Sequence, residues 1–313
     1  MNQLPEQDLP PGRHRLLKEH LMTEIRLSEA VRDGQEPLPA RRGGRWLRPA
    51  LAGAAVATAA AVALVLLPSS GESAQPPSRA TVALLEDIAL AAEHEQPYGR
   101  IRDDQFVYVD SKVSGGEAAD GKFTVTPLHR LQTWTSVDGR HTGLGREDGR
   151  EDWNYEPGGG PGSESWEIAP YYNHVKTLPT TADAMWDYLY RTAPRYSGQE
   201  RYQAMFVLAG DLLNQALLPP EQSAALFRAV ARIPGVTLVD DAVDAVGRHG
   251  VGVARTDPDN PSRDEWIFDR RTYAFLGDRR VATEDFSNVK KGTVLAHTAV
   301  LRRAVVDRVG QLP

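Results

Sequence analysis

Histidines and carboxylates are the side chains of this 313-residue sequence that could perform acid–base or metal chemistry. Six histidines follow residue 68, and none lies three or four positions from another, so no helix would present two of them to one metal ion. They are His94, His129, His141, His174, His249 and His297. A metal site or a catalytic triad would have to be assembled by the fold, and we expect no metal ion.

Acidic residues gather in two runs, at 148–152 and at 240–244. A glycosidase needs two carboxylates that face each other across a cleft, whereas runs in turn-like sequence are typically solvated. Asp257, Asp259 and Asn260 resemble a calcium loop only in part, because the EF-hand glycine and terminal glutamate are missing. No serine elbow, Walker loop, H-E-x-x-H or dinucleotide motif is present. We therefore expect no enzymatic activity and no cofactor.

The longest apolar stretch determines where these side chains are placed relative to a membrane. Residues 50–67 are eighteen positions without a charge, and as a helix they would span roughly 27 Å, close to the thickness of a bilayer core. Trp46 and Leu47 extend the stretch, and Pro68 ends it. The sequence predicts a transmembrane helix over 46–68.

Two other interpretations of this stretch stay open. It could be a buried alanine-rich helix of a soluble core, or the apolar part of a cleaved signal peptide. The preceding arm is long for a signal peptide, and the nearest small-residue site, at Ser73 and Ala74, follows a glutamate.

Flanking charge predicts the orientation. Arg41, Arg42, Arg45 and Arg48 precede the span, while residues 69–78 carry one glutamate and no base, so the N-terminus is expected in the cytoplasm. We expect a cytoplasmic arm (1–45), a linker (69–80) and an extracytoplasmic domain (81–313) in the cell membrane. Residues 69–313 hold 27 basic and 35 acidic residues, which argues against nucleic acid as a partner. Cysteine is absent, so the domain has no disulfides.

The arm contains one candidate interaction segment. Apolar residues recur at helical spacing through Arg13–Leu27, at Leu16, Leu17, Leu21 and Ile25. This helix could dock a cytoplasmic partner or the inner membrane surface, or be a juxtamembrane helix without a partner.

The exterior domain changes its periodicity along the chain. Helical spacing is predicted over 79–94, 181–193, 202–218 and 221–232, with Thr181 as an N-cap. Period-two patterns predict strands at 105–113 (exposed on one side), 128–137 and five times between 236 and 309. Residues 114–121 are expected to be a turn or loop. Arg270–Arg271 and Arg279–Arg280 are expected at sheet edges, where charge prevents strand pairing.

These elements predict an α+β fold, a curved, half-barrel-like antiparallel sheet with helices on one face. Such a sheet could enclose an apolar ligand. The candidate lining residues, each of which could equally be ordinary core, are Trp134, Trp186, Phe206, Phe227, Trp266 and Phe268. Residues 147–166 combine acids, glycines and Trp153, Tyr155 and Trp166; they are expected to be a surface loop or a lid over a cavity.

Four segments carry a resemblance to a known family: Gln105–Val109, Trp134–Arg140, Ile233–Val239 and Glu265–Gly277. With the order of the other elements, they make nearly the whole chain resemble an uncharacterised family of actinobacterial single-pass membrane proteins. The C-terminal region also resembles the half-barrels of lipoprotein carriers and of RseB-type envelope-stress regulators. Members of the family are often encoded beside extracytoplasmic-function sigma factors, which implies a link to envelope signalling. The arm carries no His-x₃-Cys-x₂-Cys zinc motif of the kind found in many anti-sigma factors.

The sequence thus favours a membrane-anchored extracytoplasmic binding or regulatory module that senses a lipid or another envelope component. A protein ligand outside and a cytoplasmic partner at Arg13–Leu27 are further candidate partners. The alternative is an extracytoplasmic hydrolase that acts on cell-envelope polymers.

Overall fold

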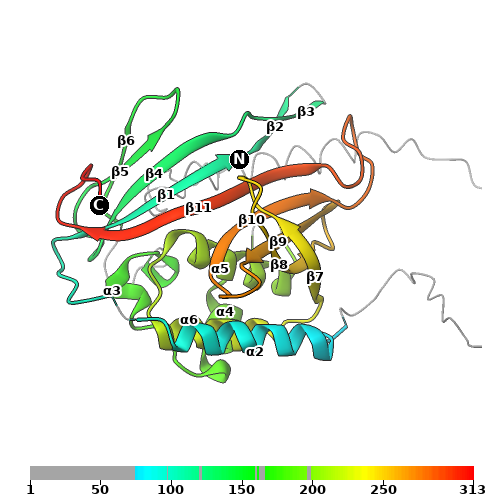
Figure 1. Cartoon of the computed structure of the whole chain (residues 1–313), viewed down its shortest axis with the longest axis horizontal. Helices are drawn as coiled ribbons and strands as arrows, with labels where there is room; N and C mark the ends of the chain where they lie inside the picture. The colour runs from blue at the N-terminus through cyan, green and yellow to red at the C-terminus, as the bar shows by residue number, and fades with distance from the viewer. Residues whose placement is uncertain (1–74, 97, 120–121, 159–160, 162–165, 196–198) are drawn as a thin grey trace, which may run out of the picture.

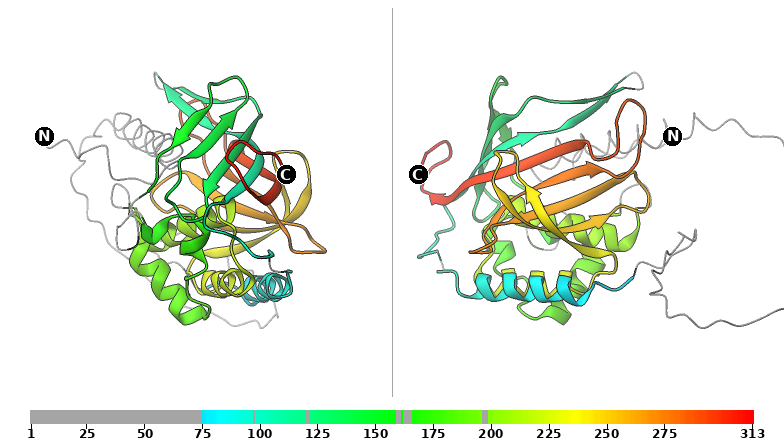
Figure 2. Two further views of the ribbon diagram at one scale, coloured as in Figure 1. Left: turned by 90° about the vertical axis from the view of Figure 1, so that its left-hand side faces the viewer. Right: turned by 45° about the vertical axis from the view of Figure 1, so that its right-hand side comes forward.

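A computed structural model describes residues 75–313, except positions 97, 120–121, 159–160, 162–165 and 196–198. The described residues form an α+β fold in which a large antiparallel sheet is covered by helices on one face (Figure 1). The predicted α+β class and antiparallel sheet are therefore confirmed. Figure 2 shows the same two layers from two further sides, with the helices beneath the sheet in each view.

The main sheet has nine strands in the order β6-β5-β4-β1-β11-β10-β9-β8-β7, and a separate hairpin pairs β2 with β3. The first group of strands is β1 (Phe106–Ser114), β2 (Gly116–Ala119), β3 (Lys122–Val125), β4 (His129–Ser136), β5 (Gly143–Glu147) and β6 (Trp153–Tyr155). The second group is β7 (Val236–Val243), β8 (His249–Thr256), β9 (Ser262–Phe268), β10 (Phe275–Ala282) and β11 (Val294–Val306). The first and last strands of the domain, β1 and β11, pair at the centre of the sheet.

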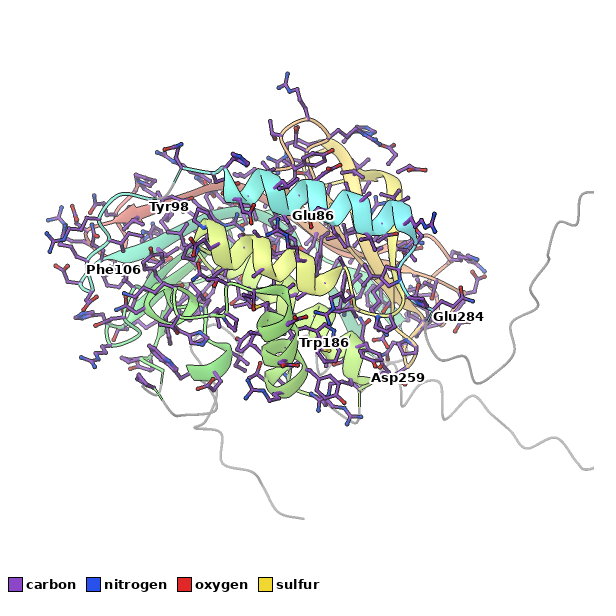
Figure 3. The ribbon with its side chains drawn as sticks, turned by 90° about the horizontal axis from the view of Figure 1, so that it is seen from below. Glu86, Tyr98, Phe106, Trp186, Asp259 and Glu284 are labelled. Carbon is purple, nitrogen blue, oxygen red and sulfur yellow. The ribbon has the colours of Figure 1, made fainter. Side chains whose placement is uncertain are left out.

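The helices lie mainly between the two groups of strands in the sequence. They are α2 (Arg79–Glu93), α3 (Tyr172–Val175), α4 (Ala182–Thr192), α5 (Arg201–Gln215) and α6 (Pro220–Val230), with a 3₁₀ turn, η1 (Trp166–Ile168). Figure 3 views this layer from below and shows α2 and α6 as neighbours, with Glu86 labelled on α2. Arg228 of α6 reaches across to Glu86, at 2.8 Å, and to Glu93 of α2.

Each helix begins where its local sequence can satisfy the free backbone N–H groups. The side chains of Ser78 and Thr181 accept from the backbone N–H groups of Thr81 and Ala184, and Glu200 accepts from two backbone N–H groups at the start of α5. Pro220 occupies the first turn of α6, where its missing N–H costs nothing. The predicted N-cap at Thr181 is confirmed.

The main core fills the space between the helices and one face of β7–β9. It contains the apolar side of α2, including Leu85 and Ile88, most of α5 and α6, and Trp266 and Phe268 of β9. Because residues alternate between the two faces of a strand, the residues between these aromatics point to the opposite face of the sheet. That face carries two clusters to which none of the described helices contributes.

The opposite face is tightly curved where β7 approaches β9. Gly252 of β8 allows this approach, since a β-carbon there would lie 3.0 Å from that of Val239 and 3.2 Å from that of Ala242. A register shift in β7 between Val239 and Ala242 bends the strand at the same place. Arg248, in the turn after β7, consequently reaches the carbonyl oxygens of Leu276 (2.9 Å) and Val300 (3.0 Å).

Three local predictions were wrong. Within the stretch 114–121, which was predicted to be a turn or loop, residues 116–119 form strand β2, which pairs with β3. Strand β1 is buried on both faces over residues 106–111, because the C-terminal segment covers the face opposite the helices: the indole N–H of Trp134 on β4 donates to the carbonyl of Gln311 at 2.6 Å. Arg279 and Arg280 lie on β10, between β9 and β11, and each pairs with a carboxylate of β9.

The predictions for residues 1–74 lie outside the described residues. These are the cytoplasmic arm with its Arg13–Leu27 helix, the transmembrane helix over 46–68 and most of the linker. Within the described ranges, no helix is long and apolar enough to cross a bilayer.

Candidate functional site

Four of the six candidate lining aromatics lie together between the helices and the sheet. Phe206 of α5 stacks on Trp266 of β9, with ring centroids 4.0 Å apart and planes within 5°. Phe227 of α6 meets Phe268 of β9 edge to face at 5.6 Å. We call the region around these four residues the seam; it lies where α5 and α6 meet the helix-facing side of β8–β10. All four rings are buried, so the seam is a layer of closely packed aromatic side chains.

The other two candidates lie elsewhere. Trp186 of α4 is half-buried at the edge of the helix layer, where it stacks on Tyr190 at 5.0 Å (Figure 3). Trp134 is fully buried on the opposite face of the sheet, 5.1 Å from the ring of Tyr108. The six residues therefore do not form one site. That the four seam residues line a ligand cavity stays a prediction.

A network of polar residues at the seam was not anticipated from the sequence. Arg255 of β8 is only 2% exposed, and its guanidinium donates to Gln203 of α5 and to Glu200, the N-cap residue of that helix, each at 2.7 Å. Gln203 donates onward to Asp264 of β9 at 2.7 Å, and Asp264 also accepts from Arg280 of β10 at 2.8 Å. Charged and polar groups thus connect the first turn of α5 to the centre of the sheet.

Asp278 of β10 adds an acid whose pKa lies well above the usual range of an aspartate. It lies on the helix-facing side, and its Oδ1 atom is buried without a hydrogen-bond partner in the described part of the chain. Burial is the main reason that the pKa of Asp278 is raised to about 6; Asp264 and Asp211 raise the pKa further, while Thr298 and Arg280 lower it. The seam therefore combines aromatic walls with one carboxyl group that titrates between pH 5 and 7.

Sequence reasoning missed this network because its members are far apart in the sequence. Gln203 and Asp264 are separated by 61 positions, and no local motif joins them. A usable signal does exist: Asp264 shares its face with Trp266 and Phe268, so a charge stands in an otherwise apolar alternation. A charged residue on a core-facing strand position needs a partner.

The other candidate groups of the sequence form structural contacts. One of the candidate histidines, His141, lies beside Ser136 and Asp138, but the Ser136 hydroxyl donates to Asp138 at 2.8 Å and accepts only from the backbone N–H of His141. In a catalytic triad the histidine would lie between the serine and the carboxylate. Here Asp138 also accepts from the backbone N–H of Arg140 at 2.9 Å, so the three residues stabilise a turn.

The segment that was expected to be a loop or a lid contains β6 and an aromatic cluster. Trp166 lies 5.7 Å from Tyr171, and burial raises the pKa of Tyr171 to about 12. A shallow pocket beside it, lined by Tyr155, Tyr171 and His141 among others, offers about 10 Å³, room for about one water molecule. Neither Trp153 nor Trp166 lines this pocket.

The carboxylate runs and the calcium-like loop make internal contacts as well. Asp244 is buried and pairs with Arg248 at 2.5 Å, while Asp241 is exposed beside His249. Asp257 accepts from the backbone N–H of Asp259 and from the side chain of Asn260. Among the described residues, no group of three histidine or acidic side chains is arranged to hold a metal ion.

Comparison with known proteins adds no relative: no family model matches the chain, and none of the curated proteins is significantly similar to it.

Proposed function

We propose that this chain is a membrane-anchored binding module whose domain lies outside the cell and whose arm lies in the cytoplasm. The observation that carries the proposal is the order of three segments along the chain: basic residues, an apolar stretch and a folded domain. Four arginines precede an uncharged stretch of eighteen residues, and only eleven residues, 68–78, separate that stretch from α2. A domain with its own core thus follows a segment of membrane-spanning length directly.

The proposed ligand is a lipid or another apolar envelope component, and the proposed binding region is the seam. The layout supports this choice: helices cover one face of an antiparallel sheet, as in the half-barrels of lipoprotein carriers, which the C-terminal region resembles. At the seam, a buried aromatic stack also lies beside polar groups such as Arg255 and Asp264. Apolar walls with a few fixed polar groups are typical of sites for small amphipathic ligands.

Signalling would follow from coupling the occupied seam to the arm. Helix α2 is the first described element after the anchor, and it packs on α6, which supplies Phe227 to the seam. A ligand that separates α5 or α6 from the sheet would therefore displace α2 as well. The proposed output is a change at Arg13–Leu27, in line with the sigma-factor link that the resemblance implies.

The binding part of the proposal can be tested by photochemical capture. The full chain would be placed in lipid nanodiscs that contain a phospholipid with a diazirine at the end of one acyl chain. After irradiation and digestion, we expect cross-linked peptides from α5 and β9 in addition to the span. Cross-links confined to residues 46–68 would show that the seam takes no lipid.

A further inference from the structure

The helix-free face of the sheet has an unusual arrangement of charge. Three carboxylates on this face, Asp110, Asp244 and Glu265, have side chains 9%, 0% and 0% exposed. Their arginine partners Arg130, Arg248 and Arg263 are 43%, 37% and 37% exposed. In each pair the acid is inside and the base reaches solvent, so this face presents guanidinium groups although residues 69–313 are acidic overall.

Glu265 is the centre of one such group. It accepts from Arg263 at 2.8 Å through Oε1 and from Arg279 at 2.7 Å through Oε2. One buried negative charge is thus shared by two arginines, which leaves one net positive charge at this position. Arginine has five N–H donors, and these contacts use only some of them.

Strand register continues this row of basic side chains across the sheet. Arg279 of β10 is the register partner of both Glu265 in β9 and His297 in β11. His297 is opposite Ser114 in β1, and Lys112, two residues earlier on the same face, is opposite Arg130 in β4. We call the four cations Arg263, Arg279, Lys112 and Arg130, together with the imidazole of His297 that lies between them, the cationic band. It crosses five strands, a width of about 19 Å at the usual strand spacing.

Two members of the cationic band have weak or no internal partners. The imidazole of His297 is half-buried and makes no side-chain hydrogen bond within the described ranges; burial lowers the pKa of His297, so it offers a hydrogen-bonding group and not a fixed charge. Lys112 has only a distant ion pair, 3.8 Å, with the exposed carboxylate of Asp148 at the rim. A ligand could therefore gain contacts here without breaking a buried pair.

We propose that the cationic band binds an extended polyanion whose units are joined by phosphodiesters, such as a polyol-phosphate polymer of the cell envelope. The width of the band matches several successive charges better than one phosphate. Guanidinium groups bind phosphate oxygens in pairs and keep their charge at every physiological pH. This site is on the opposite side of the sheet from the seam, so it does not depend on lipid binding there.

Binding can be measured with the full chain in a non-ionic detergent and a fluorescein-labelled poly(glycerol phosphate) probe. Two variants test the band: Lys112→Gln, and Arg263→Gln, which leaves Glu265 paired with Arg279. The matched control is Arg232→Gln, since Arg232 is an exposed arginine after α6 whose partner Asp183 is also exposed. Thermal unfolding of each variant checks that it is folded, and Lys112→Gln carries the test if Arg263→Gln unfolds.

We expect each band variant to weaken binding of the probe by roughly two- to fivefold, the effect of one exposed ion pair. The slope of log affinity against log salt concentration should become shallower by about one. Arg232→Gln should bind as the unmodified chain does. The proposal is overturned if the folded chain does not bind the probe, if Arg232→Gln is equally impaired, or if polyglutamate of equal charge binds as well. None of these outcomes depends on where the domain lies relative to the membrane.

Discussion

Phe206 of α5 and Trp266 of β9 stack face to face, 4.0 Å between centroids, and this pair joins the helix layer to the sheet. The ring of Trp266 also lies under Gly210 of α5, where a β-carbon would be 2.7 Å from the indole nitrogen. Close approach of α5 to β9 therefore requires both the aromatic pair and a residue without a side chain.

The first prediction concerns this stack. Phe206→Ala should lower the free energy of unfolding by about 3–5 kcal/mol, because it leaves a cavity against a buried ring. Urea unfolding followed by tryptophan fluorescence measures the change. Leu312→Ala is the control, since Leu312 is 59% exposed and should have almost no effect. A similar small loss for both variants would mean that the stack does not hold the layers together.

The sequence predicted the elements on each side of this stack because their periodicities are local. Phe206 is in an apolar run of helical length before two prolines, and Trp266 is in one of several short strands separated by turn residues. What it could not predict is which residues meet. Arg279 and Arg280 were placed at an edge because strand order depends on pairing between distant segments, whereas β10 lies inside the sheet.

The polar network was missed for the same reason. Glu200 caps α5 locally, which a sequence can suggest, but its contact with Arg255 joins positions 55 residues apart. The β2–β3 hairpin was missed because Gly115, Gly116 and Gly121 resemble a loop. Candidate sites built from distant residues therefore required the structure.

The second prediction concerns the buried arginine of the network. Arg255→Met should destabilise the fold by about 3–5 kcal/mol, because Glu200, Gln203 and the carbonyl of Pro234 would all lose their donor. Arg232→Met is the control, as its exposed pair with Asp183 should contribute about 0–1 kcal/mol. Chemical denaturation at pH 7 compares them, and equal effects would refute a structural role for the network.

The third prediction concerns pH. Because the pKa of Asp278 is raised to about 6 in the folded chain, the folded state binds more protons than the unfolded state between about pH 4 and 6. Ionisation of Asp278 therefore destabilises the fold as the pH rises through this window. Asp278→Asn should remove the effect and stabilise the protein above pH 6 by on the order of 2–3 kcal/mol.

The control for the pH experiment is Asp269→Asn, whose effect on stability should be opposite to that of Asp278→Asn. Backbone N–H groups of Thr272 and Arg271 lower the pKa of Asp269, so its ionised form favours the folded state. Asp269→Asn should reduce stability above pH 4 and leave it unchanged below the lowered pKa. Melting curves from pH 3 to 8 distinguish the two variants; parallel profiles for Asp278→Asn and the unmodified chain would contradict the assignment.

The fourth prediction concerns Arg248, which connects the turn after β7 to the centre of the sheet. Its guanidinium pairs with buried Asp244 and with the carbonyl groups of Leu276 and Val300. Arg248→Ala should increase amide hydrogen exchange in β7 and β10 and destabilise the fold by about 3 kcal/mol, because Asp244 would be buried without its partner. Arg271→Ala, in the exposed β9–β10 turn, is the control; faster exchange in both would indicate a general loosening instead.

The proposed topology is tested most directly by labelling single cysteines in intact cells. The natural chain has no cysteine, so only the introduced thiol of each variant can react. Glu284→Cys places a thiol at an exposed position of the domain (Figure 3), and Ser28→Cys places one in the arm. A membrane-impermeant maleimide should label Glu284→Cys in intact cells and Ser28→Cys only after permeabilisation. Labelling of Ser28→Cys in intact cells, or protection of Glu284→Cys until the cells are permeabilised, would contradict a membrane anchor with its domain outside.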